Sequence, residues 1–185
     1  MTATAAQYAQ LDAWIDAHFD EQVKFLQALV QVPTDTPPGN NAPHAERTAD
    51  LLKTFGYEAE KHAVPEADVK AYGLESITNL IVRRKYGAGK TIALNAHGDV
   101  VPPGEGWTHP PYGGEIHNGA MYGRATAVSK SDFSTFTFAT RASCSRSALM
   151  ASMSPTRRNT CTSGRSIPGS GGRMASAPGH SARAS

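Results

Sequence analysis

A histidine and an aspartate one residue apart end an apolar segment, which reads Leu94-Asn95-Ala96-His97-Gly98-Asp99-Val100-Val101-Pro102. In extended backbone, residues i and i+2 point to the same side, so Asp99 can accept an N–H from His97. That bond fixes the imidazole tautomer and leaves the other ring nitrogen for a metal ion. The spacing therefore predicts that His97 is a metal ligand oriented by Asp99. A hydrogen-bonded histidine at a strand end, beside a turn aspartate, is the simpler alternative.

The elements upstream of this segment are predicted from hydrophobic spacing. Apolar residues three and four apart predict a helix over about 8–32, which must end before Pro33 because proline removes a hydrogen-bond donor. A second helix is predicted over 43–55, with Gly56 suited to the left-handed backbone just past its end. A weakly alternating stretch, 57–64, is predicted as a strand, and 65–76 as a loop.

The following segments predict paired strands and one more helix. Two apolar runs, 79–86 and 90–97, are separated by Gly87-Ala88-Gly89, which predicts a strand–turn–strand unit. Asn118-Gly119 predicts a hairpin turn, and 130–141 is predicted as a helix. Helices that alternate with strands predict a layered α/β domain. In such domains active sites gather at the carboxyl ends of strands, which is where His97 would lie.

The composition changes near residue 141. Residues 1–132 hold all 16 acidic and 11 of the 18 basic residues, whereas 133–185 hold seven arginines and no acid. The latter stretch also contains 12 of the 15 serines, and no aromatic residue follows Phe138. Such a composition buries too little apolar surface to offset the entropy of ordering. We therefore expect a globular domain over 1–141 and a disordered Ser/Arg-rich tail over 142–185.

Composition also excludes some classes of protein. No window approaches 18 consecutive apolar residues, so a membrane-spanning helix is not expected. The first residues lack a basic segment followed by an apolar core, so a secretory signal is not expected and a cytoplasmic location is. The two cysteines, Cys144 and Cys161, have a spacing that fits no zinc pattern.

Several ordered motifs accompany His97-Gly98-Asp99: Phe25 to Pro33, Thr36-Pro37-Pro38-Gly39-Asn40, Trp107, Pro111-Tyr112, Asn118-Gly119 and Tyr122-Gly123-Arg124. Over about 20–141 the chain resembles the zinc-dependent amidohydrolase and exopeptidase family of acetylornithine deacetylase, succinyl-diaminopimelate desuccinylase, aminoacylase and glutamate carboxypeptidase. The resemblance implies the N-terminal part of a zinc-exopeptidase-like, three-layer α/β/α catalytic domain.

The resemblance also implies a site with two zinc ions, in which His97 ligates one zinc and Asp99 orients that histidine. The family's bridging aspartate falls at Val128, which cannot bind zinc. Asp132 lies one helical turn later and is the candidate second metal ligand. The alternative is that Asp132 only stabilises the first turn of the next helix. Two other histidines, His109 and His117, lie in a loop and beside a hairpin turn and are not assigned to the site.

The activity implied by the resemblance is hydrolysis of N-acyl or peptide amide bonds in small substrates, by enzymes that are often homodimers. The family next requires a strand ending in Glu-Glu, which supplies the general base and a zinc ligand, and then further ligands. No acidic residue follows Asp132. We therefore expect a truncated metallohydrolase that is inactive as this fragment and binds at most one zinc ion weakly.

The tail has two interpretations. Back-translated in another frame, residues 159–166 can encode an apolar strand leading to Glu-Glu, which is consistent with a frameshift. The alternative is a catalytically dead interaction module whose Arg/Ser tail binds nucleic acid. Thinly spaced arginines, and the lack of aromatic residues that could stack on bases, disfavour nucleic acid as a partner.

Overall fold

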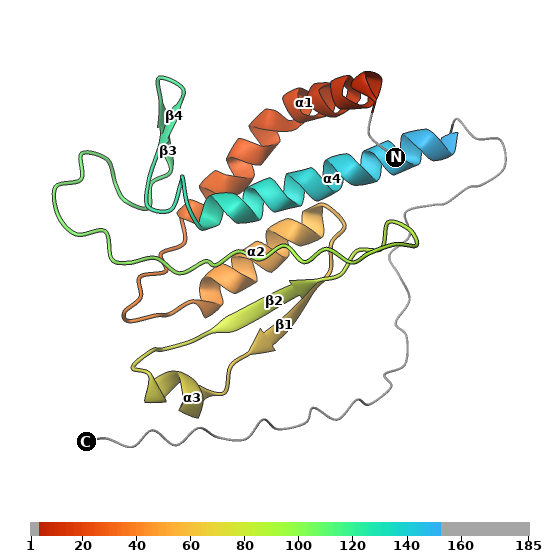
Figure 1. Ribbon diagram of the computed structural model, residues 1–185. Coiled ribbons are helices and arrows are strands. Elements are labelled where there is room, and N and C mark those ends of the chain that lie inside the picture. The colour runs from red at the N-terminus through yellow and green to blue at the C-terminus, as the bar shows by residue number, and fades with distance from the viewer. Residues whose placement is uncertain (1–3, 153–185) are drawn as a thin grey trace, which may run out of the picture.

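The computed structural model describes residues 4–152 of the 185-residue chain, and side chains up to residue 144. The elements, shown in Figure 1, are α1 (Ala5–Val30), α2 (Ala42–Thr54), β1 (Ala59–Ala63), α3 (Glu66–Ala71), β2 (Thr78–Val82), β3 (Glu115–His117), β4 (Ala120–Tyr122) and α4 (Lys130–Ser152). The tail predicted to be disordered spans 142–185, and its residues from 153 onward lie outside the described part.

The first two helices form as the sequence predicts. A capping box between Thr4 and Gln7 begins α1. It ends at Val30, three residues before Pro33. Helix α2 ends at Thr54, and Gly56 follows with φ of 73°. A positive φ is the conformation for which glycine is favoured past a helix end.

The loop predicted over 65–76 is wrong in its first half, because α3 occupies Glu66–Ala71. Pro65 precedes the helix, acidic residues lie in its first turn, and Lys70 pairs with Glu66 at 2.5 Å one turn earlier. Val69 is 2% exposed and anchors the helix to the body of the protein. The sequence carries these capping signals, but six residues are too few to show a helical period.

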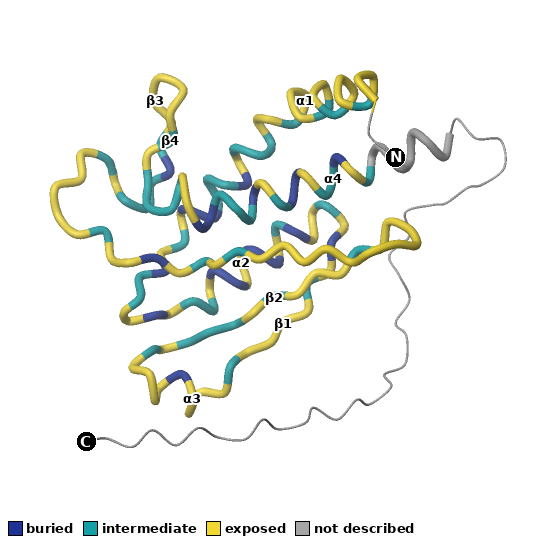
Figure 2. The backbone as a smooth tube through the Cα atoms, in the orientation of Figure 1, coloured by how far each residue is buried: buried dark blue, intermediate teal, exposed yellow. Residues whose placement is uncertain are grey.

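The predicted pairing of 79–86 with 90–97 is also wrong. β2 pairs antiparallel with β1, from Ala59 opposite Val82 to Ala63 opposite Thr78. Residues 90–97 belong to no helix or strand. β1 provides the hydrogen-bonding partner of β2, and the described part of the chain provides no strand beside 90–97. Figure 2 shows this segment as largely exposed.

Helix α4 is longer than predicted, since it continues from Lys130 to Ser152 rather than ending near 141. The boundary expected between domain and tail therefore falls inside a helix. Figure 1 shows α4 beside α1, with α2 next to them and the β1–β2 ribbon beyond α2. The buried aromatic and aliphatic core lies between these helices and comprises Phe25, Leu29, Leu52, Tyr57 and Phe138.

The described part is mixed α/β, as predicted, with two separate two-stranded antiparallel sheets, β1–β2 and β3–β4. The β3–β4 hairpin turns at Asn118 and Gly119, both with positive φ, as the Asn-Gly signal predicts. None of the described helices is both long and apolar enough to span a membrane.

Candidate functional site

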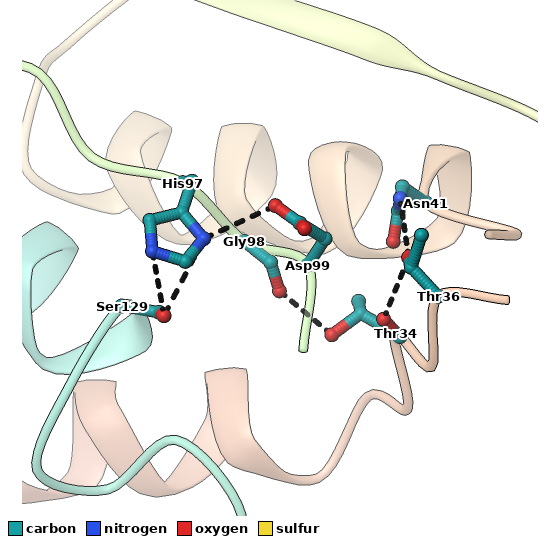
Figure 3. Close-up of polar contacts among 7 residues, drawn as sticks. All are labelled: Thr34, Thr36, Asn41, His97, Gly98, Asp99 and Ser129. Carbon is teal, nitrogen blue, oxygen red and sulfur yellow. Dashed lines mark hydrogen bonds and ion pairs between the residues drawn. The ribbon is translucent and has the colours of Figure 1, made fainter. Parts of the chain in front are cut away.

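Backbone contacts with the loop after α1 position the His97–Asp99 segment. Val100 forms a parallel bridge with Asp35, with hydrogen bonds Val100 N–H to Thr34 O at 3.0 Å and Thr36 N–H to Val100 O at 2.8 Å. The Thr34 hydroxyl also donates to the carbonyl oxygen of Gly98 at 2.7 Å (Figure 3). These bonds fix the backbone immediately on both sides of Asp99.

The structure brings His97 and Asp99 together at the spacing that the sequence suggests. His97 Nδ1 lies 3.1 Å from Asp99 Oδ1, with the two side chains 58% and 49% exposed. The Ser129 hydroxyl oxygen also contacts the ring, 3.0 Å from His97 Nε2 and 3.4 Å from Nδ1 (Figure 3). When Nδ1–H is donated to Asp99, Nε2 is left as an acceptor toward Ser129. Three polar side chains, a carboxylate, an imidazole and a hydroxyl, are thus in contact.

Gly98 is required where this segment crosses α2. A Cβ at Gly98 would lie 2.7 Å from Nδ1 of His44, closer than real side chains approach. His44 is only 4% exposed, and its Nε2 has no hydrogen-bond partner within the described residues. Burial, and secondarily the charge of Lys130, lowers the pKa of His44 to about 3. A neutral, buried imidazole therefore supports the backbone between His97 and Asp99.

Lys130 fastens the start of α4 to the loop after α1. It is fully buried, and its ammonium donates to the carbonyl oxygen of Val32 at 2.5 Å and lies 5.6 Å from the centre of the Tyr112 ring. Burial lowers the pKa of Lys130 to about 8, against an opposing effect of Asp35. The Tyr112 hydroxyl donates to Asp35, and burial, together with this hydrogen bond, raises the pKa of Tyr112. Because Lys130 is held here, its neighbour Ser129 is held against His97.

Asp132 lies in the first turn of α4, where it is half-buried. Within the described residues no hydrogen bond or ion pair joins it to His97, whose ring contacts Ser129 instead. Val128 is 65% exposed. The position of Asp132 in the first turn of α4 is the one that the alternative interpretation expects.

These residues do not fit a catalytic zinc centre. Such a centre needs about three protein ligands arranged around an open position. The described part of the chain offers one oriented imidazole at His97, with a serine hydroxyl rather than a carboxylate beside Nε2.

A different set of metal-ligating side chains does come together. These are His109, Glu115 and His117, whose ligand atoms all lie within 4.8 Å of one another. The sequence analysis left both histidines unassigned. The signal was the alternation of Glu115 and His117 on one face of a strand. His109 could not be added from the sequence, because its approach depends on how the preceding loop folds back.

Comparison with known proteins yields partial matches, among them several succinyl-diaminopimelate desuccinylases. The succinyl-diaminopimelate desuccinylase of Wolinella succinogenes is 46% identical over 109 residues, which is 59% of this chain and 26% of that protein. The desuccinylase of Hydrogenovibrio crunogenus is 37% identical over 127 residues, which is 65% of this chain and 29% of that protein. The desuccinylase of Methylorubrum extorquens is 36% identical over 118 residues, which is 63% of this chain and 29% of that protein.

The matched part of the chain, about 60% of its residues, is homologous to the succinyl-diaminopimelate desuccinylases. The homology agrees with the resemblance inferred from the motifs around His97. The chain spans less than a third of the length of the desuccinylases that it matches. No protein-family model and no solved structure matches it.

Proposed function

We propose that the chain carries the first part of the catalytic domain of a metal-dependent amide hydrolase related to the desuccinylases. In this proposal residues 1–141 correspond to the N-terminal part of a three-layer α/β/α domain, and His97 stands where the complete enzymes hold a zinc ligand. The substrates of the complete proteins are small N-acyl amino acids or peptides, such as N-succinyl amino acids.

The observation that carries the proposal is the contact of 3.1 Å between His97 Nδ1 and Asp99 Oδ1. A carboxylate behind an imidazole is the usual support of a metal-binding histidine, because it fixes the tautomer and strengthens the other nitrogen as a donor. The homology supplies the context in which that pair serves hydrolysis.

The same geometry argues that this 185-residue chain does not hydrolyse amides itself. A positioned general base contributes about 10²–10⁴ in rate, and no acidic residue follows Asp132 in the sequence to supply one. Neither Asp132 nor another carboxylate among the described residues contacts His97 Nε2. One imidazole holds zinc weakly, so the metal-bound nucleophile of the complete enzymes is not assembled.

The test combines zinc titration by calorimetry with an assay on N-succinyl and N-acetyl amino acids. The titrations use a background with both His109→Ala and His117→Ala, so that the histidines at the β3–β4 hairpin do not contribute. We expect weak zinc binding, further weakening in His97→Ala, strengthening of roughly tenfold or more in Val128→Asp from the added carboxylate, and no turnover. His62→Ala, which removes an exposed histidine on β1, is the matched control. Tight binding of two zinc ions, or turnover lost in His97→Ala, would contradict the proposal.

A further inference from the structure

Three polar side chains converge where the β3–β4 hairpin meets the loop before it. Oε2 of Glu115 lies 2.9 Å from His109 Nδ1 and 3.2 Å from His117 Nε2. The carboxylate therefore has an imidazole nitrogen on either side. The two rings face each other with centroids 4.9 Å apart, at an interplanar angle of 30°.

We propose that His109, Glu115 and His117 form a binding site for a divalent first-row metal ion such as Zn²⁺. Two imidazoles and one carboxylate, with a further position left to water, is a donor set found in zinc sites. Donors around a tetrahedral zinc ion lie about 3.3 Å apart, given metal–ligand bonds of about 2.0–2.1 Å. The two contacts made by Glu115 are close to that separation, and all three ligand atoms lie within 4.8 Å of one another.

The hairpin holds two of the ligands before any metal binds. Glu115 and His117 are i and i+2 on β3, so they share one face of the strand. Cross-strand register places Tyr122 opposite Glu115, and its ring packs on that of His109 with centroids 4.2 Å apart. The turn at Asn118 and Gly119 fixes this register.

The base of the hairpin is attached to the rest of the protein. The side-chain amide of Gln27 on α1 donates to the carbonyl oxygen of Gly114 at 2.8 Å. Gly114 has a φ of 62°, and a Cβ there would lie 3.0 Å from Gln27 Cγ. The start of β3 is therefore held against α1, and less conformational freedom is lost when the ligands converge on an ion.

Charge and exposure also suit an ion that enters from solvent. The side chains of His109, Glu115 and His117 are 28%, 40% and 53% exposed, which leaves an open side for a water ligand. Neutral imidazoles and a carboxylate together give the ion a compensating charge.

β1 provides an internal comparison. Glu60 and His62 repeat the carboxylate–x–imidazole spacing, with Oε2 and Nε2 3.4 Å apart. Glu60 also pairs with the guanidinium of Arg83, a cation that competes with a metal ion. No second histidine joins this pair within the described residues. The β1 pair should therefore bind metal poorly, which makes His62 the matched control for His117.

The experiment uses the full chain with His97→Ala, which removes the zinc ligand of the proposed function. A failure of the hairpin site is then distinguishable from a failure of the proposed function. Zn²⁺ is titrated by competition with a chromophoric chelator, and Co²⁺ by its visible absorption. We expect one ion per chain. His109→Ala and His117→Ala should each weaken binding at least about tenfold, whereas His62→Ala should change it less than about twofold. Equal affinities in all four proteins would overturn the site.

A second measurement does not depend on the variants folding. Histidine modification by diethyl pyrocarbonate is mapped by mass spectrometry with and without Zn²⁺. We expect the ion to protect His109 and His117 several-fold and to leave His62 unprotected. Equal protection of all three histidines, or protection of none, would show that no ion occupies the hairpin.

Discussion

His44 shows how much of the candidate site rests on a residue that performs no chemistry there. Its ring supports the backbone at Gly98, where a Cβ would lie 2.7 Å from Nδ1. The imidazole is buried, its Nε2 has no hydrogen-bond partner among the described residues, and its pKa is lowered to about 3. A group that cannot be protonated in its folded environment makes stability depend on pH.

At the residue scale we predict a loss of stability in acid that depends on His44. Its pKa is about 6.5 when exposed and about 3 in the fold, so between these values the unfolded chain binds more protons. Stability is then unaffected by this group above about pH 6.5, and falls by up to about 1.4 kcal/mol per pH unit below it. Urea unfolding at pH 7 and pH 5 measures the loss, and His44→Leu should reduce it. An identical pH dependence in the two proteins would refute the assignment.

Some helices and strands are determined by their own residues, whereas others form only when a second segment packs beside them. Helices α1 and α2 follow from their apolar spacing and from end signals at Thr4 and Gly56, which act within one or two turns. The segment 90–97 has an apolar, strand-like sequence, yet a strand exists only where another strand supplies hydrogen bonds. β2 obtained that partner from β1, and 90–97 did not.

At the element scale, the packing of α4 on α1 should depend on Phe138. This residue is 3% exposed and makes edge-on contacts with Phe25 and Phe55, at centroid distances of 6.0 and 5.5 Å. Phe138→Ala leaves a cavity and should lower the free energy of unfolding by about 3–5 kcal/mol. Thr135→Ala, on the exposed face of α4, is the control and should change it by less than about 0.5 kcal/mol. Denaturant unfolding measures both, and similar values would mean that α4 is not packed as described.

On the scale of the whole molecule, the uncovered apolar surface is the main consequence of the missing strand pairing. Ile92 and Leu94, in the unpaired segment 90–97, are 82% and 51% exposed. Extended apolar segments without a partner strand promote association between chains.

We therefore predict that the chain associates with itself as its concentration rises, and that residues 90–97 form the contact between copies. Ile92→Lys combined with Leu94→Lys should shift the protein toward monomer, because each lysine adds charge where a second chain would pair. Tyr72→Lys, which replaces an equally exposed aromatic residue (84% exposed) elsewhere, should have no such effect. Sedimentation velocity distinguishes them. A wild-type protein that is monodisperse and monomeric would contradict this prediction.

The sequence alone determined the features that depend on neighbours along the chain: the ends of α1 and α2, the Asn118-Gly119 turn, and the pairing of His97 with Asp99. In each case the interacting atoms lie within a few residues, so backbone geometry brings them together. Only the tertiary structure decided that Ser129 rather than Asp132 faces His97, that His44 lies beneath Gly98, and that His109 joins Glu115 and His117. The first two of these contacts join segments more than thirty residues apart, and the third depends on the path of an irregular loop. No local period or spacing encodes them, because they form only when the helices and the hairpin pack.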